Sequence, residues 1–213
     1  METLEQIEVR TKIKNPLLVN AMRQSIAQAC YAVFLKKGFN NTSVDEIASF
    51  MNVDKRNLYN YIGRKEDLLY LTFCHYLPLF AERIRTSMKN LNHPVEKLRA
   101  ALLQNLDLTD EFPGFYTLVG RELRYLNRSY ISHVLGLIRT LYEIYQKILE
   151  EGIALSLFRK CDPKIVSFAM MSMIYTKATN RWELDSYSNE AFADETFSLM
   201  VNGILARQDG SIA

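Results

Sequence analysis

The sequence is poor in cysteine and histidine and has no long apolar run. Its three cysteines, Cys30, Cys74 and Cys161, form no CxxC pair, so we expect neither a disulfide framework nor a cysteine-based zinc site. The three histidines include no helical pair with a carboxylate ligand, and we therefore predict no metal site and no cofactor. Apolar stretches such as residues 167–175 are much shorter than the roughly 20 residues that cross a bilayer, so we predict no membrane partner.

Motifs that support catalysis are also absent. The chain has no glycine-rich phosphate loop, no Gly-x-Ser-x-Gly and no Cys–His order typical of nucleophilic enzymes. We therefore predict a protein that is not an enzyme and has no catalytic residues. Three glutamates stand among the first nine residues and no apolar h-region follows, so we expect no secretory signal and a soluble, cytoplasmic protein.

The charge is distributed unevenly along the chain. The formal net charge is +2, but residues 10–65 carry ten Lys or Arg against three Asp or Glu. Residues 66–213 carry 16 basic against 18 acidic residues. A positive segment next to a nearly balanced one indicates a module that meets an anionic polymer.

Apolar residues recur with helical periodicity almost throughout, and no run alternates long enough to indicate a strand, so we predict an all-α fold. A first helix is predicted over residues 16–37, with Gly38 as its stop. Ser43 and Glu46 form a predicted capping box that opens a second helix ending near Met51.

A third, short helix is predicted over residues 55–62. Asp54 is a good N-cap for it, and Asn52 tolerates the left-handed conformation that a tight turn between helices needs. These three helices predict a helix-turn-helix domain over residues 1–64, including an N-terminal arm.

The predicted third helix has an apolar seam on one side and a polar face on the other. Lysine and arginine side chains reach phosphates or guanine edges, and asparagine pairs with adenine. Tyrosine hydroxyls can bind phosphates, while basic residues of the arm can follow the DNA backbone. This chemistry predicts DNA contacts at Lys55, Arg56, Asn57, Tyr59, Asn60 and Tyr61. A solvated helical hairpin within an ordinary all-α domain is the alternative.

Residues 25–69 resemble the DNA-binding domain of the TetR (tetracycline-repressor-like) family of transcriptional regulators. The matched features are a helix ending in Phe-x-x-x-Gly-Phe, then Thr-Ser-Val-x-x-Ile-Ala, a short turn, Leu-Tyr-x-Tyr and Lys-Glu-Asp-Leu. The resemblance implies a homodimer on a palindromic operator in double-stranded DNA. It also implies a helical C-terminal domain that dimerises and binds a small-molecule inducer. The family's DNA contacts carry over to Ser43, Lys55, Asn57, Tyr59, Tyr61 and Lys65.

Four positions depart from the family's pattern. Asn52 stands where the family usually has Gly, and Arg56 where a small residue is common. Ile62 replaces the usual Phe, and Arg64 the usual Ser or Asn cap. We expect the last two to soften the junction between the third and fourth helices.

Residues 65–213 are predicted to form a helical ligand-binding and dimerisation bundle. The expected helices cover residues 65–89, 94–108, 113–127, 129–151, 163–182 and 189–206. Ser129 is the expected cap of the helix over 129–151 and Gly152 follows its expected end, while Asp162 is the expected N-cap of the helix over 163–182. The helix over 163–182 has almost no polar face, which predicts that one side packs on the core and the other on a partner subunit. A monomer with a deep core is the alternative.

A mixture of aromatic, flexible and scattered polar side chains predicts a pocket for a mainly apolar ligand with a polar end. The candidate residues are Phe115, Tyr116, Val119, Glu122, Tyr125, Tyr142, Tyr145, Met170, Met173 and Asn180. Plain core packing is the alternative for each. Residues 156–182 are similar to relatives that sense acyl-CoA thioesters, which implies that an acyl-CoA is one candidate inducer.

Together these observations predict a ligand-responsive DNA-binding transcriptional regulator. It would act as a repressor that a small, mostly apolar inducer releases from a palindromic operator. The alternative is an all-helical protein-interaction adaptor without sequence-specific DNA binding, which leaves the basic third helix unexplained.

Overall fold

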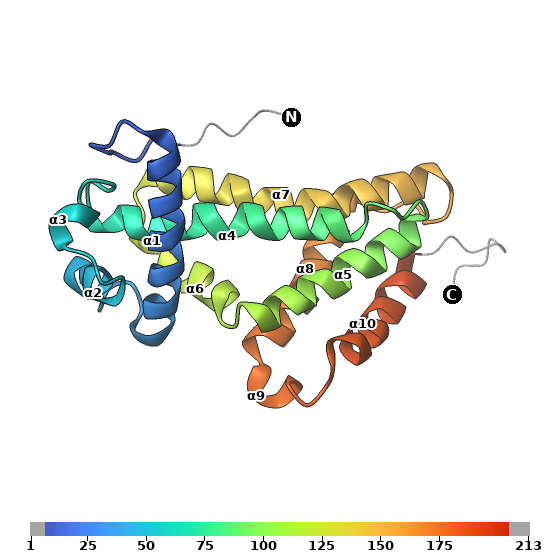
Figure 1. Cartoon of the computed structure of the whole chain (residues 1–213). Helices are drawn as coiled ribbons and strands as arrows, with labels where there is room; N and C mark the ends of the chain where they lie inside the picture. The colour runs from blue at the N-terminus through green and yellow to red at the C-terminus, as the bar shows by residue number, and fades with distance from the viewer. Residues whose placement is uncertain (1–6, 205–213) are drawn as a thin grey trace. The chain divides into compact units, whose positions relative to one another are not determined.

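The computed structural model describes residues 7–204, and its elements within that range are helices (Figure 1). The all-α prediction is confirmed for this part of the chain. The chain divides into two compact units: the N-terminal unit, of residues 1–79 with 117–138, and the C-terminal unit, of residues 80–116 with 139–213. The expected functional division into residues 1–64 and 65–213 stays a prediction.

Helix α1 spans Pro16–Lys37, as predicted. Asn15 caps its start, where Oδ1 accepts a hydrogen bond from the Leu17 amide at 3.0 Å. Pro16 suits the first helical position because its missing N–H would have no partner there. Gly38 ends the helix with φ 77°, a conformation that costs glycine little.

Helix α2, Val44–Phe50, and helix α3, Lys55–Leu58, follow as the expected pair. Asn52 in the turn has φ 53°, which confirms the left-handed conformation expected there. Helix α3 ends at Leu58 and not at Ile62. The chain leaves helical geometry because the Asn60 carbonyl accepts from the Lys12 amide at 2.8 Å and from Thr11 Oγ1 at 3.0 Å.

Helix α4, Lys65–Ser87, continues through Pro78. The predicted sixth helix is shorter than expected: α6 spans Phe115–Glu122, and the 3-10 helix η1, Leu123–Tyr125, follows it. It begins after Gly114, whose φ of 79° excludes a helix starting at Pro113. Helix α7, Arg128–Ala154, is capped by Asn127, whose Oδ1 accepts from the Tyr130 amide at 3.0 Å, and not by Ser129.

The C-terminal unit contains α5, α8, α9 and α10. Helix α5, Pro94–Glu111, packs against α8, Pro163–Thr179, and α10, Asn189–Ile204. Asp162 caps α8 as predicted, but α8 ends at Thr179 and a short α9, Arg181–Leu184, follows. The predicted end of the last helix at Ala206 lies outside the described residues.

One buried lysine ties three helices of this unit together. Lys177 of α8 is 3% exposed and donates to Asn189 and, at 3.1 Å, to the Tyr187 carbonyl. Asn189 at the start of α10 donates to Asp107 at 3.0 Å and to Asp110 at 2.8 Å on α5. These bonds satisfy an ammonium that would otherwise be costly to bury.

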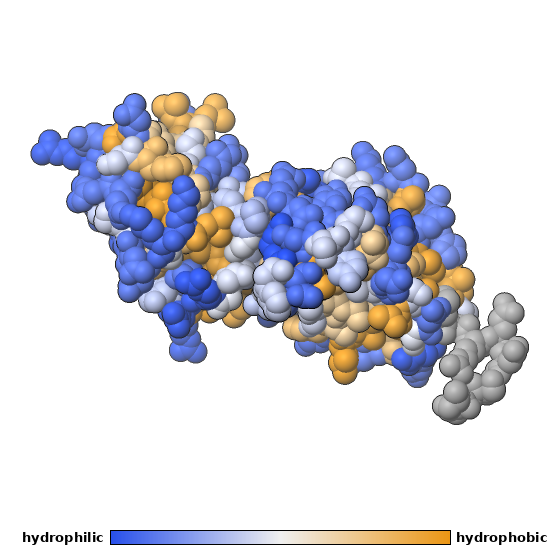
Figure 2. All heavy atoms as spheres, turned by 90° about the horizontal axis from the view of Figure 1, so that it is seen from below, coloured by the Kyte–Doolittle hydropathy of each residue, from blue (hydrophilic) through white to orange (hydrophobic). Residues whose placement is uncertain are grey.

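Helices α8 and α10 also expose apolar side chains. Figure 2 shows one face of the molecule, on which apolar groups break a mostly hydrophilic surface. On α8, Ile165 is 69% exposed and Phe168 48% exposed, and on α10 Leu199 is 69% exposed. Met170, Met171 and Ile174 lie on the buried side of α8. The helix therefore has the two apolar faces that its sequence predicts.

The sequence predicts that Gly152 follows the end of α7, but this glycine lies inside the helix. The left-handed residue is Ser156, with φ 57°, and the amides of Leu157 and Phe158 bond to the Gly152 carbonyl at 2.9 and 3.1 Å. A Cβ on Gly152 would lie 2.1 Å from the Phe158 ring, which is 2% exposed. Close approach of this ring explains the glycine.

Gly152→Ala is therefore expected to destabilise the protein, by about 1–3 kcal/mol, because a buried ring must move to admit the methyl group. Thermal unfolding followed by circular dichroism measures the change. Gly203→Ala is the matched control, since a Cβ there meets nothing within 4 Å and alanine favours the helix. Equal melting temperatures for wild type and Gly152→Ala would contradict the packing account.

Candidate nucleic-acid interface

The start of α3 presents a cationic and amide surface supported by buried apolar residues. Lys55, Arg56 and Asn57 are exposed. Leu58 is 1% and Ile62 2% exposed. The apolar seam thus holds the short helix in place, while the residues with hydrogen-bonding capacity face solvent.

Local capping fixes the two helices of this surface. Ser43 Oγ accepts from the Glu46 amide at 3.1 Å, and the Ser43 amide donates to Glu46 Oε2 at 2.8 Å. This capping box leaves the Ser43 hydroxyl proton available to a phosphate oxygen. Asp54 Oδ1 accepts from the Arg56 amide at 2.6 Å and so orients the first turn of α3.

Lys55 forms an ion pair within the protein itself. Its Nζ lies 2.6 Å from Asp45 Oδ2 on α2, and both side chains are exposed. The hydrogen bond to Asp45 raises the pKa of Lys55, so the ammonium stays charged. An exposed ion pair contributes little to stability, which allows Lys55 to exchange Asp45 for another anion.

The residues after α3 are more enclosed than the sequence suggests. Tyr59 and Asn60 are half-buried, and Tyr61 is 9% exposed. Asn60 lies in the turn beyond the helix, where its carbonyl binds the N-terminal arm. Arg10 and Lys12 of that arm are exposed beside Tyr59, Ile62 and Gly63, with which they line a shallow cleft.

Lys65 begins α4 at the edge of the same surface. Its Nζ donates to the Asn40 carbonyl at 3.1 Å and lies 4.5 Å from the centre of the Phe39 ring. Burial lowers the pKa of Lys65. A lysine at the N-terminus of a long helix adds its charge to the helix dipole, a combination that suits a phosphate.

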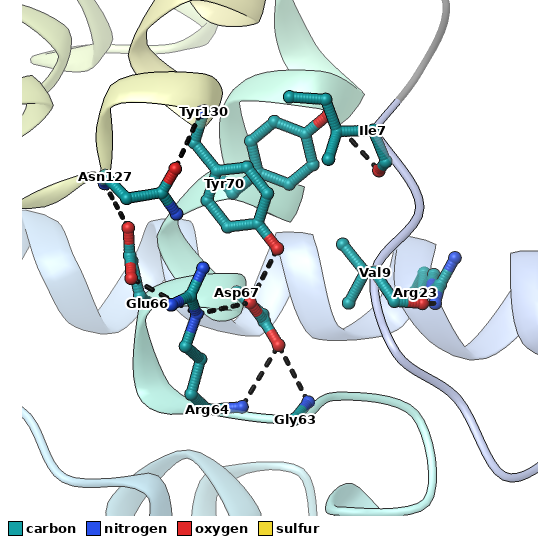
Figure 3. Close-up of polar contacts among 10 residues, drawn as sticks. All are labelled: Ile7, Val9, Arg23, Gly63, Arg64, Glu66, Asp67, Tyr70, Asn127 and Tyr130. Atoms are coloured by element: carbon teal, nitrogen blue, oxygen red, sulfur yellow. Dashed lines mark hydrogen bonds and ion pairs between the residues drawn. The ribbon is translucent and has the colours of Figure 1, made fainter.

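The turn between α3 and α4 is held by a buried carboxylate that the sequence analysis did not single out. Asp67 is 2% exposed, and its Oδ2 accepts from the amides of Gly63 at 2.7 Å and Arg64 at 3.0 Å (Figure 3). Its position in the first turn of α4, three residues after Arg64, is the signal that indicates this capping role.

A buried polar cluster lies in the C-terminal unit among the predicted ligand residues. Tyr116 donates to Asn105 Oδ1, and Asn105 Nδ2 donates to the Tyr145 hydroxyl at 3.2 Å and to Met171 at 3.5 Å. Burial raises the pKa of Tyr116 and Tyr145, so both stay neutral donors. Asn105 is 0% exposed and was missed by sequence reasoning. Asn105 stands among the apolar residues of α5, and a polar residue at such a position indicates a buried group with hydrogen-bond partners.

The other predicted ligand residues are less closely grouped. Phe115 and Met170 are buried core residues, each 1% exposed. Tyr142 stacks on Phe168 at 4.0 Å between ring centres. Asn180 caps α8 by donating to the Thr176 carbonyl at 2.8 Å. Val119 and Met173 are half-buried.

Three of the predicted ligand residues, Val119, Glu122 and Tyr125, belong to the N-terminal unit, and the last two lie close to the end of α1. Glu122 is 4% exposed, and its Oε1 lies 3.2 Å from where a Cβ on Gly38 would be. The Tyr125 ring lies 5.6 Å from that of Phe39. These contacts place both residues beside the helix-turn-helix.

The described part of the chain offers no membrane-spanning helix and no cluster of metal ligands. Within residues 7–204, no helix combines the length and apolar character needed to cross a membrane. The same part of the chain contains no group of three or more His, Cys, Asp or Glu side chains arranged to hold a metal.

Comparison with protein families identifies both parts of the chain. The family model described as bacterial regulatory proteins of the tetR family matches residues 26–70. The one described as the tetracyclin repressor-like C-terminal domain matches residues 92–204. The HTH-type transcriptional regulator HbdR of Aromatoleum sp. (strain CIB) is 25% identical over 201 residues, covering 92% of this chain and 86% of that protein.

Solved structures share the fold. FadR of Bacillus subtilis, in complex with stearoyl-CoA, superposes with a TM-score of 0.75 at 24% identity, covering 84% of this chain and 98% of that one. AibR, in complex with isovaleryl coenzyme A and operator DNA, gives a TM-score of 0.71 at 22% identity, covering 83% and 96%.

An exposed cationic helix in a helix-turn-helix, joined to a helical C-terminal part, defines a DNA-binding regulator and not an enzyme. The chain belongs to the TetR family of transcriptional regulators.

Proposed function

We propose that the protein is a cytoplasmic repressor that binds a palindromic operator as a homodimer and leaves it when a small, mostly apolar ligand binds. The single observation that supports this most is the exposed Lys55–Arg56–Asn57 segment at the start of α3, held by buried Leu58 and Ile62. Such a segment can enter a major groove without loss of core packing.

The proposed DNA contacts divide by chemistry. Asn57 reads adenine edges, while Lys55 and Arg56 reach guanine or phosphate. Ser43, Tyr59 and Lys65 bind phosphates and so fix the orientation of the domain on the duplex. Asn60 and Tyr61, which are more enclosed, contribute at the margin of the interface. In the dimer, two α3 helices about 34–36 Å apart would match one turn of DNA.

The proposed ligand is an acyl-CoA thioester. The acyl chain would lie among the apolar and aromatic residues of the C-terminal unit. The Tyr145 hydroxyl of the Asn105 cluster donates to the Ala101 carbonyl at 3.1 Å and would exchange that acceptor for the thioester carbonyl. Structures of FadR with stearoyl-CoA and AibR with isovaleryl coenzyme A support this ligand class by analogy of fold.

Acyl-CoAs of increasing chain length, from isovaleryl- to stearoyl-CoA, are expected to release the protein from its duplex. At least one should weaken DNA binding by about tenfold or more, and free coenzyme A should not, because only the thioester carries an acyl chain. Competition followed by fluorescence anisotropy measures the release. If no thioester changes DNA affinity or the melting temperature, the ligand class is wrong.

A further inference from the structure

The buried Asp67 carboxylate does more than cap α4. Its Oδ2 accepts from the Gly63 and Arg64 amides, and its Oδ1 accepts from the Tyr130 hydroxyl at 2.8 Å (Figure 3). Tyr130 is 5% exposed and lies in the first turn of α7. One carboxylate therefore joins the turn between α3 and α4 to the beginning of α7.

Further contacts strengthen this junction. The Arg64 guanidinium lies 5.3 Å from the centre of the Tyr130 ring and 3.5 Å from Asp67. Glu66 accepts a hydrogen bond from the Asn127 amide, at the cap of α7. Burial and the hydrogen bond to Asp67 raise the pKa of Tyr130 to about 12, so its hydroxyl remains a donor at neutral pH.

Tyr130 is also connected to the N-terminal arm. Its ring stacks on Tyr70, with ring centres 3.9 Å apart and planes at 11°. The Tyr70 hydroxyl lies 3.5 Å from the Ile7 carbonyl, and Arg23 of α1 donates to the Val9 carbonyl at 2.6 Å (Figure 3). Residues 7–9 of the arm are thus held beside the residues that hold the turn between α3 and α4.

We infer that Tyr130 is a positioning residue for DNA binding. Through Asp67 it ties the first turn of α7 to the turn between α3 and α4, and through Tyr70 it ties the same turn of α7 to the N-terminal arm. A displacement of the first turn of α7 therefore moves the turn between α3 and α4 together with residues 7–9 of the arm. Helix α7 also carries Tyr142 and Tyr145, two of the proposed ligand residues. The inference rests on the proposed function, since it requires that α3 and the arm bind DNA.

The expected effect follows from preorganisation. With the hydrogen bond intact, α3 and the arm are held in one arrangement before DNA arrives. Without it, DNA must select that arrangement from a broader set, so affinity falls although every DNA-contacting side chain remains.

Tyr130→Phe removes only the hydroxyl and keeps the ring on Tyr70. Asp67→Asn keeps an acceptor for the Gly63 and Arg64 amides but removes the charged partner of Tyr130. Tyr187→Phe is the matched control, because Tyr187 is 58% exposed in the C-terminal unit. The DNA is a duplex that the wild-type protein selects from a randomised library, and affinities are measured at a temperature where every variant is folded.

We expect Tyr130→Phe to bind this duplex at least fivefold more weakly than wild type, and Tyr187→Phe to bind normally. The variant with both Tyr130→Phe and Asp67→Asn should lose less affinity than the sum of the two single losses, because both changes act on the same contact. A hydrogen bond that only stabilises the fold would lower the melting temperature and leave DNA affinity unchanged, which would overturn the inference. If wild type selects no duplex, the proposed function fails as well.

Discussion

Replacing Lys55 and Asn57 together with alanine is expected to reduce operator affinity by about a hundredfold or more, because each base-reading contact contributes roughly 1–3 kcal/mol. Both side chains are exposed, and the bond of Lys55 to Asp45 lies on the surface. The fold and the dimer should therefore survive. Anisotropy titrations of the variant and wild type against one duplex measure the loss.

A matched control is available in the C-terminal unit. Lys89 and Asn90 are the same residue types, are exposed, and lie far along the chain from α3. Lys89→Ala with Asn90→Ala should bind DNA normally. Removing Lys55 should also lower the salt dependence of binding by about one counterion per subunit if it contacts a phosphate. Normal DNA binding by the Lys55 and Asn57 variant would mean that α3 does not read the operator.

Glutamate at the exposed apolar positions of α8 and α10 is expected to break the proposed dimer. Ile165→Glu with Leu199→Glu places charges where an isologous interface brings apolar side chains together, and their desolvation is costly. Because both side chains are 69% exposed in the single chain, the fold should not depend on them. Sedimentation velocity should show a monomer at micromolar concentration.

Loss of the dimer should also remove most operator affinity, because two linked half-sites bind far more tightly than one. Leu155→Glu is the control: Leu155 is 58% exposed and lies just beyond the end of α7. A dimer that persists in the double variant would show that the apolar face of α8 and α10 has another use.

Short-range signals predicted much of the fold. The capping box at Ser43 and the caps at Asp54 and Asp162 set helix starts through bonds that span two or three residues. Such contacts can be read from spacing alone. The left-handed Asn52 followed from the tolerance of asparagine for that conformation.

Long-range contacts set the features that the sequence did not predict. Helix α3 stops at Leu58 because the Asn60 carbonyl binds Thr11, 49 positions earlier. Gly152 looked like a helix stop, but it accommodates the Phe158 ring. No local pattern identifies either partner.

The same distinction applies to the candidate sites. The exposure of Lys55, Arg56 and Asn57 follows from the apolar seam on the opposite side of α3, which the sequence shows. The junction of Asp67 with Tyr130 joins residues 63 positions apart, so periodicity gave no indication of it. Likewise, composition gave no indication that Glu122 and Tyr125 lie against Gly38 and Phe39 at the end of α1, and their ligand role stays a prediction.

Binding of one particular DNA sequence can be measured by fluorescence anisotropy of the purified protein on the intergenic DNA upstream of its own gene. A scrambled duplex serves as the control, and each titration is made at two salt concentrations. We predict nanomolar binding that weakens with salt and favours the upstream duplex. Equal, weak binding to both duplexes would contradict sequence-specific recognition at this site, and no binding at low salt would contradict the DNA-binding role of α3.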